Sequence, residues 1–145
     1  MASINDPGFP GGRVPVYYTG DVNYTDSTAR TLFTIPANSI IVGGQIIGHV
    51  ASASNALGAT LSVGILPSAG GAGTEYLNAY SIGPSQGSNY QSNVPWTNFG
   101  AQNSNYGGYT SFSFGSNAIP VSGKVAGSPL GGSGPWTVVF AVLDV

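Results

Sequence analysis

Apolar and polar residues alternate singly along most of this sequence, and that pattern limits the possible folds more than any other feature. The clearest example is the segment 59–66, in which Leu61, Val63 and Ile65 fall on one side of an extended chain. Apolar residues at every second position are typical of β-strands with one buried face. Glycine or proline interrupts every window in which apolar residues have helical spacing. The chain is therefore predicted to be all-β.

Turn-forming residues divide the chain into about eight segments of this kind. The expected strands are 14–18, 31–35, 39–50, 59–66, 74–82, 109–114, 119–125 and 136–143. Short strands separated by glycine- and proline-rich turns are typical of β-sandwiches. We predict a single domain over residues 14–145, an antiparallel two-sheet sandwich arranged as a jelly roll of about eight strands. Residues 1–13 are predicted to form an extended N-terminal arm.

The segment 39–50 contains Gly43 and Gly44 at its centre, and paired glycines within a strand predict a bulge or a bend. Regular alternation would place one apolar set on the core side, namely Ile40, Val42, Ile46 and Val50. The opposite side would then carry Ile41, Gln45, Ile47 and His49.

The last expected strand, 136–143, is apolar on both faces. One face carries Trp136, Val138, Phe140 and Val142, and the other carries Thr137, Val139, Ala141 and Leu143. A strand that is apolar on both sides is usually covered on both sides, whereas a two-layer sandwich covers only one of them. The outward residues of this strand and of 39–50 are therefore predicted to contact another subunit, through Ile47, His49, Val139 and Leu143.

Charged residues are scarce, with 3 Lys and Arg against 5 Asp and Glu and a net charge of −2 at pH 7. Three basic residues cannot neutralise many phosphates, so nucleic acid is not an expected partner. No apolar run has the length of a membrane span, and the first residues lack the features of a secretory signal peptide. Because so few charges give little repulsion between molecules, the protein is predicted to function within an assembly.

Four patterns with catalytic or metal-binding potential are each incomplete. Residues 83–87 have the G-x-S-x-G spacing of a nucleophile elbow, but no helical pattern follows, and the single histidine, His49, precedes the serine. One histidine cannot form a usual zinc site. Residues 21–26 resemble the start of a calcium loop but lack its glycine and glutamate, so a polar turn is favoured over a bound ion. Asp21 and Asp26 within this segment are not expected to form the carboxylate pair of a glycosidase. We predict no catalytic residue, no metal site and no cofactor.

A long polar stretch, 83–108, has aromatic residues set among Asn, Gln and Ser. Tyrosine and tryptophan offer large rigid surfaces with a polar tip, which suits contacts with other molecules. The candidate contact residues in and beside this stretch are Tyr90, Trp96, Phe99, Tyr106 and Tyr109. Contact with a subunit or protein partner is favoured, packing onto the domain itself is the second interpretation, and stacking on a glycan is the third.

Three segments resemble small jelly-roll structural proteins of tailed bacteriophages. They are 31–41 (TLFTIPANSII), 58–64 (GATLSVG) and 136–143 (WTVVFAVL). The resemblance extends over about two-thirds of the chain and omits the arm and the aromatic stretch. Its motifs describe strands and turns, and they carry no catalytic residues.

The resemblance implies a capsid decoration or cement protein, a non-enzymatic component of the outer surface of the virion that is made in the host cytoplasm. Such proteins sit as homotrimers at the joints between major capsid subunits, so the major capsid protein and further copies of this chain are the expected partners. The alternative is a head- or tail-fibre module that contacts host-surface glycan through the aromatic stretch.

The arm is the segment expected to grip the capsid. It is rich in glycine and proline and shows no alternation, so it is not expected to add a strand to the core. Extended segments with a few apolar anchors can order on the surface of a partner. The residues predicted to make this contact are Ile4, Pro7, Phe9, Pro10 and Arg13.

Overall fold

The computed structural model describes residues 14–48, 58–82, 117–127 and 134–144. These contain seven β-strands and one short 3-10 turn. The elements are β1 (Val16–Val22), β2 (Arg30–Ile35), β3 (Ser39–Gly48), β4 (Thr60–Ile65), η1 (Pro67–Ala69), β5 (Leu77–Ser81), β6 (Ile119–Ala126) and β7 (Trp136–Asp144).

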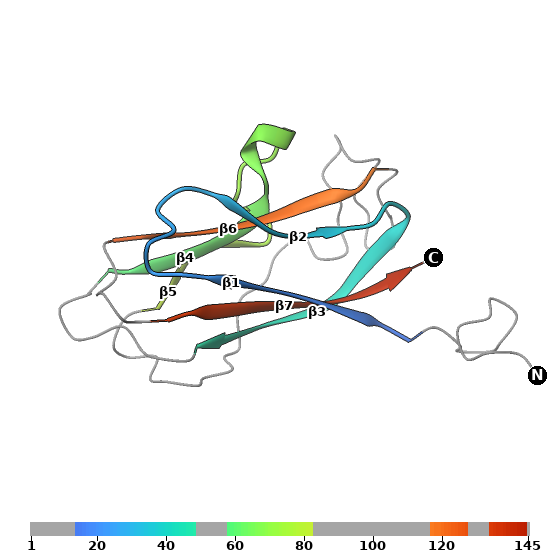
Figure 1. The fold of residues 1–145 in the computed structure, drawn as a ribbon, viewed down its shortest axis with the longest axis horizontal. Helices are drawn as coiled ribbons and strands as arrows, with labels where there is room; N and C mark the ends of the chain where they lie inside the picture. Colours follow the sequence, from blue (N-terminus) through green and yellow to red (C-terminus); the bar gives the residue numbers. More distant parts are fainter. Residues whose placement is uncertain (1–13, 49–57, 83–116, 128–133, 145) are drawn as a thin grey trace, which may run out of the picture.

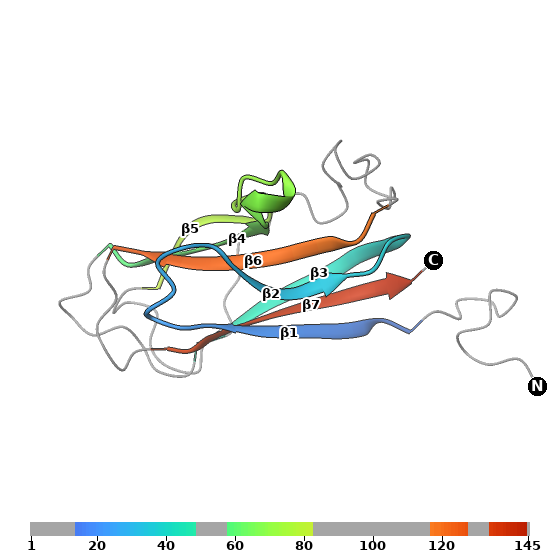
Figure 2. The same cartoon turned by 45° about the horizontal axis from the view of Figure 1, so that its top comes forward.

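The strands form two antiparallel sheets, with the orders β1-β7-β3 and β2-β6-β4-β5. The two sheets lie face to face, as Figures 1 and 2 show. The predicted antiparallel sandwich is therefore confirmed, and the described residues contain no α-helix. The strand predicted at 109–114 lies outside the described residues, so the jelly roll of about eight strands stays a prediction.

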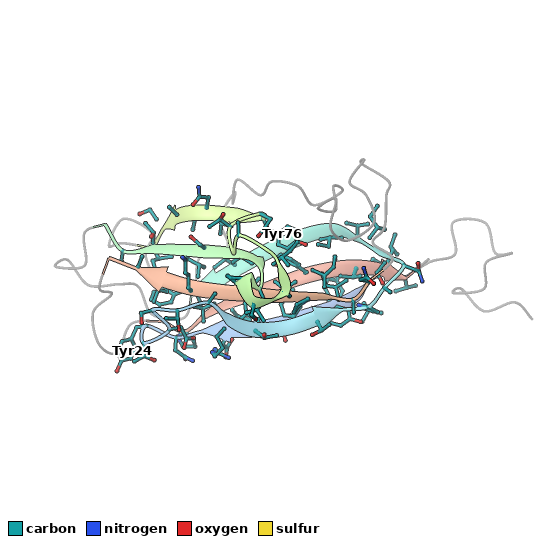
Figure 3. The ribbon with its side chains drawn as sticks, turned by 90° about the horizontal axis from the view of Figure 1, so that it is seen from above. Tyr24 and Tyr76 are labelled. Carbon is teal, nitrogen blue, oxygen red and sulfur yellow. The ribbon has the colours of Figure 1, made fainter. Side chains whose placement is uncertain are left out.

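Aromatic rings join the two sheets in the core. Trp136, Tyr76 and Phe140 are the largest fully buried side chains. The ring of Phe140 meets Phe33 of β2 and Tyr76 edge-on, with ring centroids 5.4 Å apart in each pair. Such pairs contribute about 0.5–1.5 kcal/mol each beyond the area they bury. Figure 3 shows Tyr76 over the body of the sandwich and Tyr24, which is exposed, at its corner.

The central strand of the three-stranded sheet, β7, divides its residues between two faces as predicted. Its core side consists of Trp136, Val138, Phe140 and Val142, none more than 2% exposed. The residues between them are half-buried on the other side of the sheet, namely Thr137, Val139, Ala141 and Leu143.

The alternation predicted for 39–50 is wrong in its first half. The expected bulge is present between Ile41 and Gly43, and Val42 is the extra residue. An extra residue shifts the alternation by one position, so Ile41 and Ile46 both face the core although they are five positions apart. Val42 is instead 48% exposed, and Ile40 lies on the outside of the sheet.

Hydrogen bonds hold the corner between β1 and β2. Strand β1 continues through Asp21 to Val22, so the polar turn begins later than the sequence predicted. Within the turn, the carboxylate of Asp26 accepts a hydrogen bond from the main-chain N–H of Asn23 at 2.9 Å. The guanidinium of Arg30 donates to Asp26 at 2.9 Å and to the main-chain carbonyl of Asp21 at 2.6 Å.

A single carboxylate, that of Glu75, organises the loop between β4 and β5. It accepts hydrogen bonds from the main-chain N–H groups of Ile65 at 2.8 Å, of Thr74 at 3.1 Å and of Ala72. Gly64 leaves the space that the carboxylate occupies, because a Cβ there would overlap it.

Candidate functional site

The side of the three-stranded sheet that faces away from the core is mainly apolar, although it also carries Thr19, Gln45 and Thr137, and we call it the outer face. It carries Ile40, Val42 and Ile47 of β3, Val139, Ala141 and Leu143 of β7, and Tyr17 of β1. Tyr17 is 68% exposed, and the residues of β7 are half-buried. An apolar face that water contacts is typical of a surface covered by a partner.

The opposite surface of the sandwich is polar. Cross-strand pairing places Thr31, Thr34, Thr60, Ser81 and Lys124 on the outside of the four-stranded sheet. Their side chains hydrogen-bond readily to water, so that sheet needs no cover. This contrast singles out the outer face as the candidate contact surface.

A hollow of about 320 Å³ lies in the middle of the outer face. Its lining consists of Tyr17, Gly43, Gly44, Gln45, Val139 and Ala141. Gly43 leaves open space, since a Cβ there would lie 3.9 Å from the Cβ of Ala141. The hollow therefore has an aromatic wall and one amide but no charged group, which suits an apolar side chain of a protein better than an ion.

Charge lies at one end of the outer face rather than at its centre. The carboxylate of Asp21 accepts a hydrogen bond from the hydroxyl of Thr137 at 2.6 Å. Because the carbonyl of Asp21 is also bonded to Arg30, this end of the sheet is polar and satisfied. A partner covering the central part of the outer face would not have to desolvate these groups.

The acidic residues that the structure describes are the candidates for metal binding and proton transfer. No group of three or more His, Cys, Asp or Glu in them could hold a metal ion. Partial burial acts to raise the pKa of Asp26, but hydrogen bonds from Arg30 and Asn23 outweigh it and lower the pKa. The hydrogen bond between Arg30 and Asp26 raises the pKa of Arg30. Asp26 is thus held in its charged form, which is unsuited to donating a proton.

Three of the residues predicted at the subunit interface lie on the outer face, namely Ile47, Val139 and Leu143, with Ile47 and Leu143 near opposite ends of the β3–β7 pair. The fourth, His49, lies outside the described residues, and so do the arm residues and the aromatic set from Tyr90 to Tyr109. Sequence reasoning missed Tyr17, Ile40 and Val42. For Ile40 and Val42 the signal was the glycine pair, because a bulge there reverses which residues face out.

Comparison with known proteins supports the fold. No family model matches this sequence, and no curated protein sequence is similar to it. A solved structure described as the cyanophage Pam1 capsid asymmetric unit contains a similar chain, with a TM-score of 0.51 and 18% sequence identity. The match covers 90% of this chain and 81% of that one. Among the described residues, no helix is long and apolar enough to cross a membrane.

Proposed function

We propose that this chain is a non-enzymatic structural protein of a phage virion, of the decoration or cement type, on the outer surface of the capsid. Two findings support the proposal: the likeness in fold to a chain of a phage capsid asymmetric unit, and the resemblance of three sequence segments to phage structural proteins. Since one fold can serve many functions, a surface of this chain must also fit the proposed role.

That surface is the outer face. Burial of apolar area contributes roughly 25 cal/mol for each Å² removed from water. A complex in which a partner covers Val42, Val139 and Tyr17 would therefore be stabilised, and no charge would have to be desolvated. Lasting interfaces are more apolar than transient ones. We propose that the outer face contacts a neighbouring copy within a homotrimer, and that the arm contacts the major capsid protein.

The abundance of the chain in purified virions tests this function. A cement protein occupies every equivalent joint of the shell, so gel densitometry should show hundreds of copies for each particle. A few dozen copies would instead indicate a fibre module, and absence of the chain from the particle would overturn the proposal.

A further inference from the structure

Among the described strands, β1 forms a sheet edge that differs from the other three edges in being regular. Strand β2 has a register shift between Thr31 and Phe33, β3 has its bulge at Val42, and β5 is five residues long with Ala79 at a φ of 52°. Shifts, bulges and short lengths are the usual protection of edges against pairing with other chains. The seven residues of β1 keep one continuous register against β7. Figure 2 shows β1 along the rim of the sandwich.

The backbone groups on this edge can be assigned from one hydrogen bond. Arg30, in the other sheet, donates to the carbonyl of Asp21, so that carbonyl points away from β7. In an antiparallel pair, every second residue directs both its N–H and its C=O to the same side. The N–H and C=O groups of Tyr17 and Thr19 therefore also point away from β7, and no partner for them occurs among the described residues.

We propose that this edge pairs with the same edge of a second copy, antiparallel and about a two-fold axis through Tyr18. Tyr17 of each copy then lies opposite Thr19 of the other, and the two residues exchange both of their hydrogen bonds. The four open groups of Tyr17 and Thr19 on each edge are all satisfied in this register. The result is one continuous six-stranded sheet that leaves both outer faces uncovered.

The ends of the edge match in the same register. Pro15 would lie opposite Asp21 of the second copy, and Pro15 has no N–H to donate. The carbonyl that such an N–H would need is that of Asp21, which Arg30 already bonds. The donor that Pro15 lacks would thus face the carbonyl of Asp21, which already accepts a hydrogen bond from Arg30. For this reason a second copy fits this edge better than an unrelated strand.

The side chains also fit one another. Val16, which is 54% exposed, would lie beside Gly20 of the second copy. Gly20 has no side chain, and a Cβ there would lie 2.6 Å from the Cβ of Leu32. Within each copy Leu32 already fills the space beside Gly20, so the exposed valine of the other copy would lie at the strand edge there without meeting a side chain of residue 20.

The contact is small, because edge pairing over these few residues covers much less than the roughly 800 Å² on each partner that a standard interface buries. It would join copies that a capsid already holds close together, so its role rests on the proposed function. The pairing itself needs no capsid, and it is tested on the concentrated protein. A failure of the pairing would leave the copy number in virions unaffected, which distinguishes the two proposals.

Disulfide mapping tests the register, because the chain has no cysteine of its own. In Tyr18→Cys the two cysteines face each other on the axis, so mild oxidation should convert most of the chain into a linked dimer. Tyr17→Cys and Thr19→Cys should each form little disulfide-linked dimer alone, whereas a mixture of the two should give the linked heterodimer. Val42→Cys reports association through the outer face, as distinct from the edge of β1.

The mixture keeps the test valid if Tyr18→Cys fails to fold, since Tyr17 and Thr19 are both exposed. Melting curves of the reduced variants establish that the fold is intact. A folded Tyr18→Cys that forms no disulfide-linked dimer, or a mixture that links no better than either variant alone, would overturn the proposal.

Discussion

The guanidinium of Arg30 and the carboxylate of Asp26 lie 2.9 Å apart at the corner where the chain passes from the three-stranded to the four-stranded sheet. Asp26 also accepts the N–H of Asn23, and its main-chain carbonyl accepts the N–H of Val125 in β6 at 2.8 Å. The corner therefore links β1, β2 and β6, and its strength depends on the charge of one carboxylate.

Acid should weaken this corner. The pKa of Asp26 is lower in the folded protein than its ordinary value, because Arg30 and Asn23 outweigh the effect of partial burial. A lowered pKa stabilises the fold above the ordinary pKa, and that stabilisation is lost as the pH falls below about 4. The melting temperature of the native protein should therefore fall more steeply in this range than that of Asp26→Asn. Parallel curves for the two proteins would contradict the prediction.

Replacement of Glu75 by Gln should destabilise the loop between β4 and β5. The carboxylate accepts three main-chain N–H groups, and an amide can offer only one acceptor oxygen in its place. Leaving one N–H without a partner costs about 1–3 kcal/mol, measurable as a change in the free energy of unfolding in urea. Ser68→Ala, at an exposed position in the same loop, is the control and should leave that free energy unchanged.

Substitution of two glycines of the three-stranded sheet by alanine should change the free energy of unfolding by different amounts. In Gly20→Ala the new Cβ would lie 2.6 Å from Leu32, so the two sheets must shift, at a cost of about 1–3 kcal/mol. In Gly43→Ala the nearest atom is 3.9 Å away, which is an ordinary contact, so the free energy of unfolding should stay within about 0.5 kcal/mol. Equal losses of unfolding free energy in the two variants would contradict the prediction, because they would mean that the contact with Leu32 does not require a glycine at position 20.

Much of this fold follows from the sequence pattern, because alternation reports which side of a strand is buried. The two faces of β7 were predicted residue by residue for this reason. The pattern fails at Val42, since a bulge reverses the alternation and its position just before the glycine pair cannot be read from spacing alone. Correcting it moves Ile40 and Val42 to the outer face, which makes that surface more apolar than the sequence indicated.

Other features depend on contacts between distant parts of the chain. Glu75 appears in the sequence as an isolated acid, and only the approach of the β4–β5 loop to Ile65 gives its carboxylate three donors. Gly20 resembles any glycine in a strand until Leu32 is seen against it. No local pattern encodes such pairings, so they could not be predicted.

The outer face is the surface through which we propose that copies associate, and sedimentation of two matched variants tests this directly. Val139→Asp places a carboxylate at the centre of the outer face, where an unpaired charge in a dry interface costs several kcal/mol. Thr34→Asp makes a similar change on the polar side of the sandwich, where water solvates the charge.

We predict that the native protein and Thr34→Asp sediment as the same oligomer, and that Val139→Asp sediments as a folded monomer with its melting curve retained. An oligomer of native mass formed by Val139→Asp, or a native protein that is already monomeric at micromolar concentration, would contradict the account.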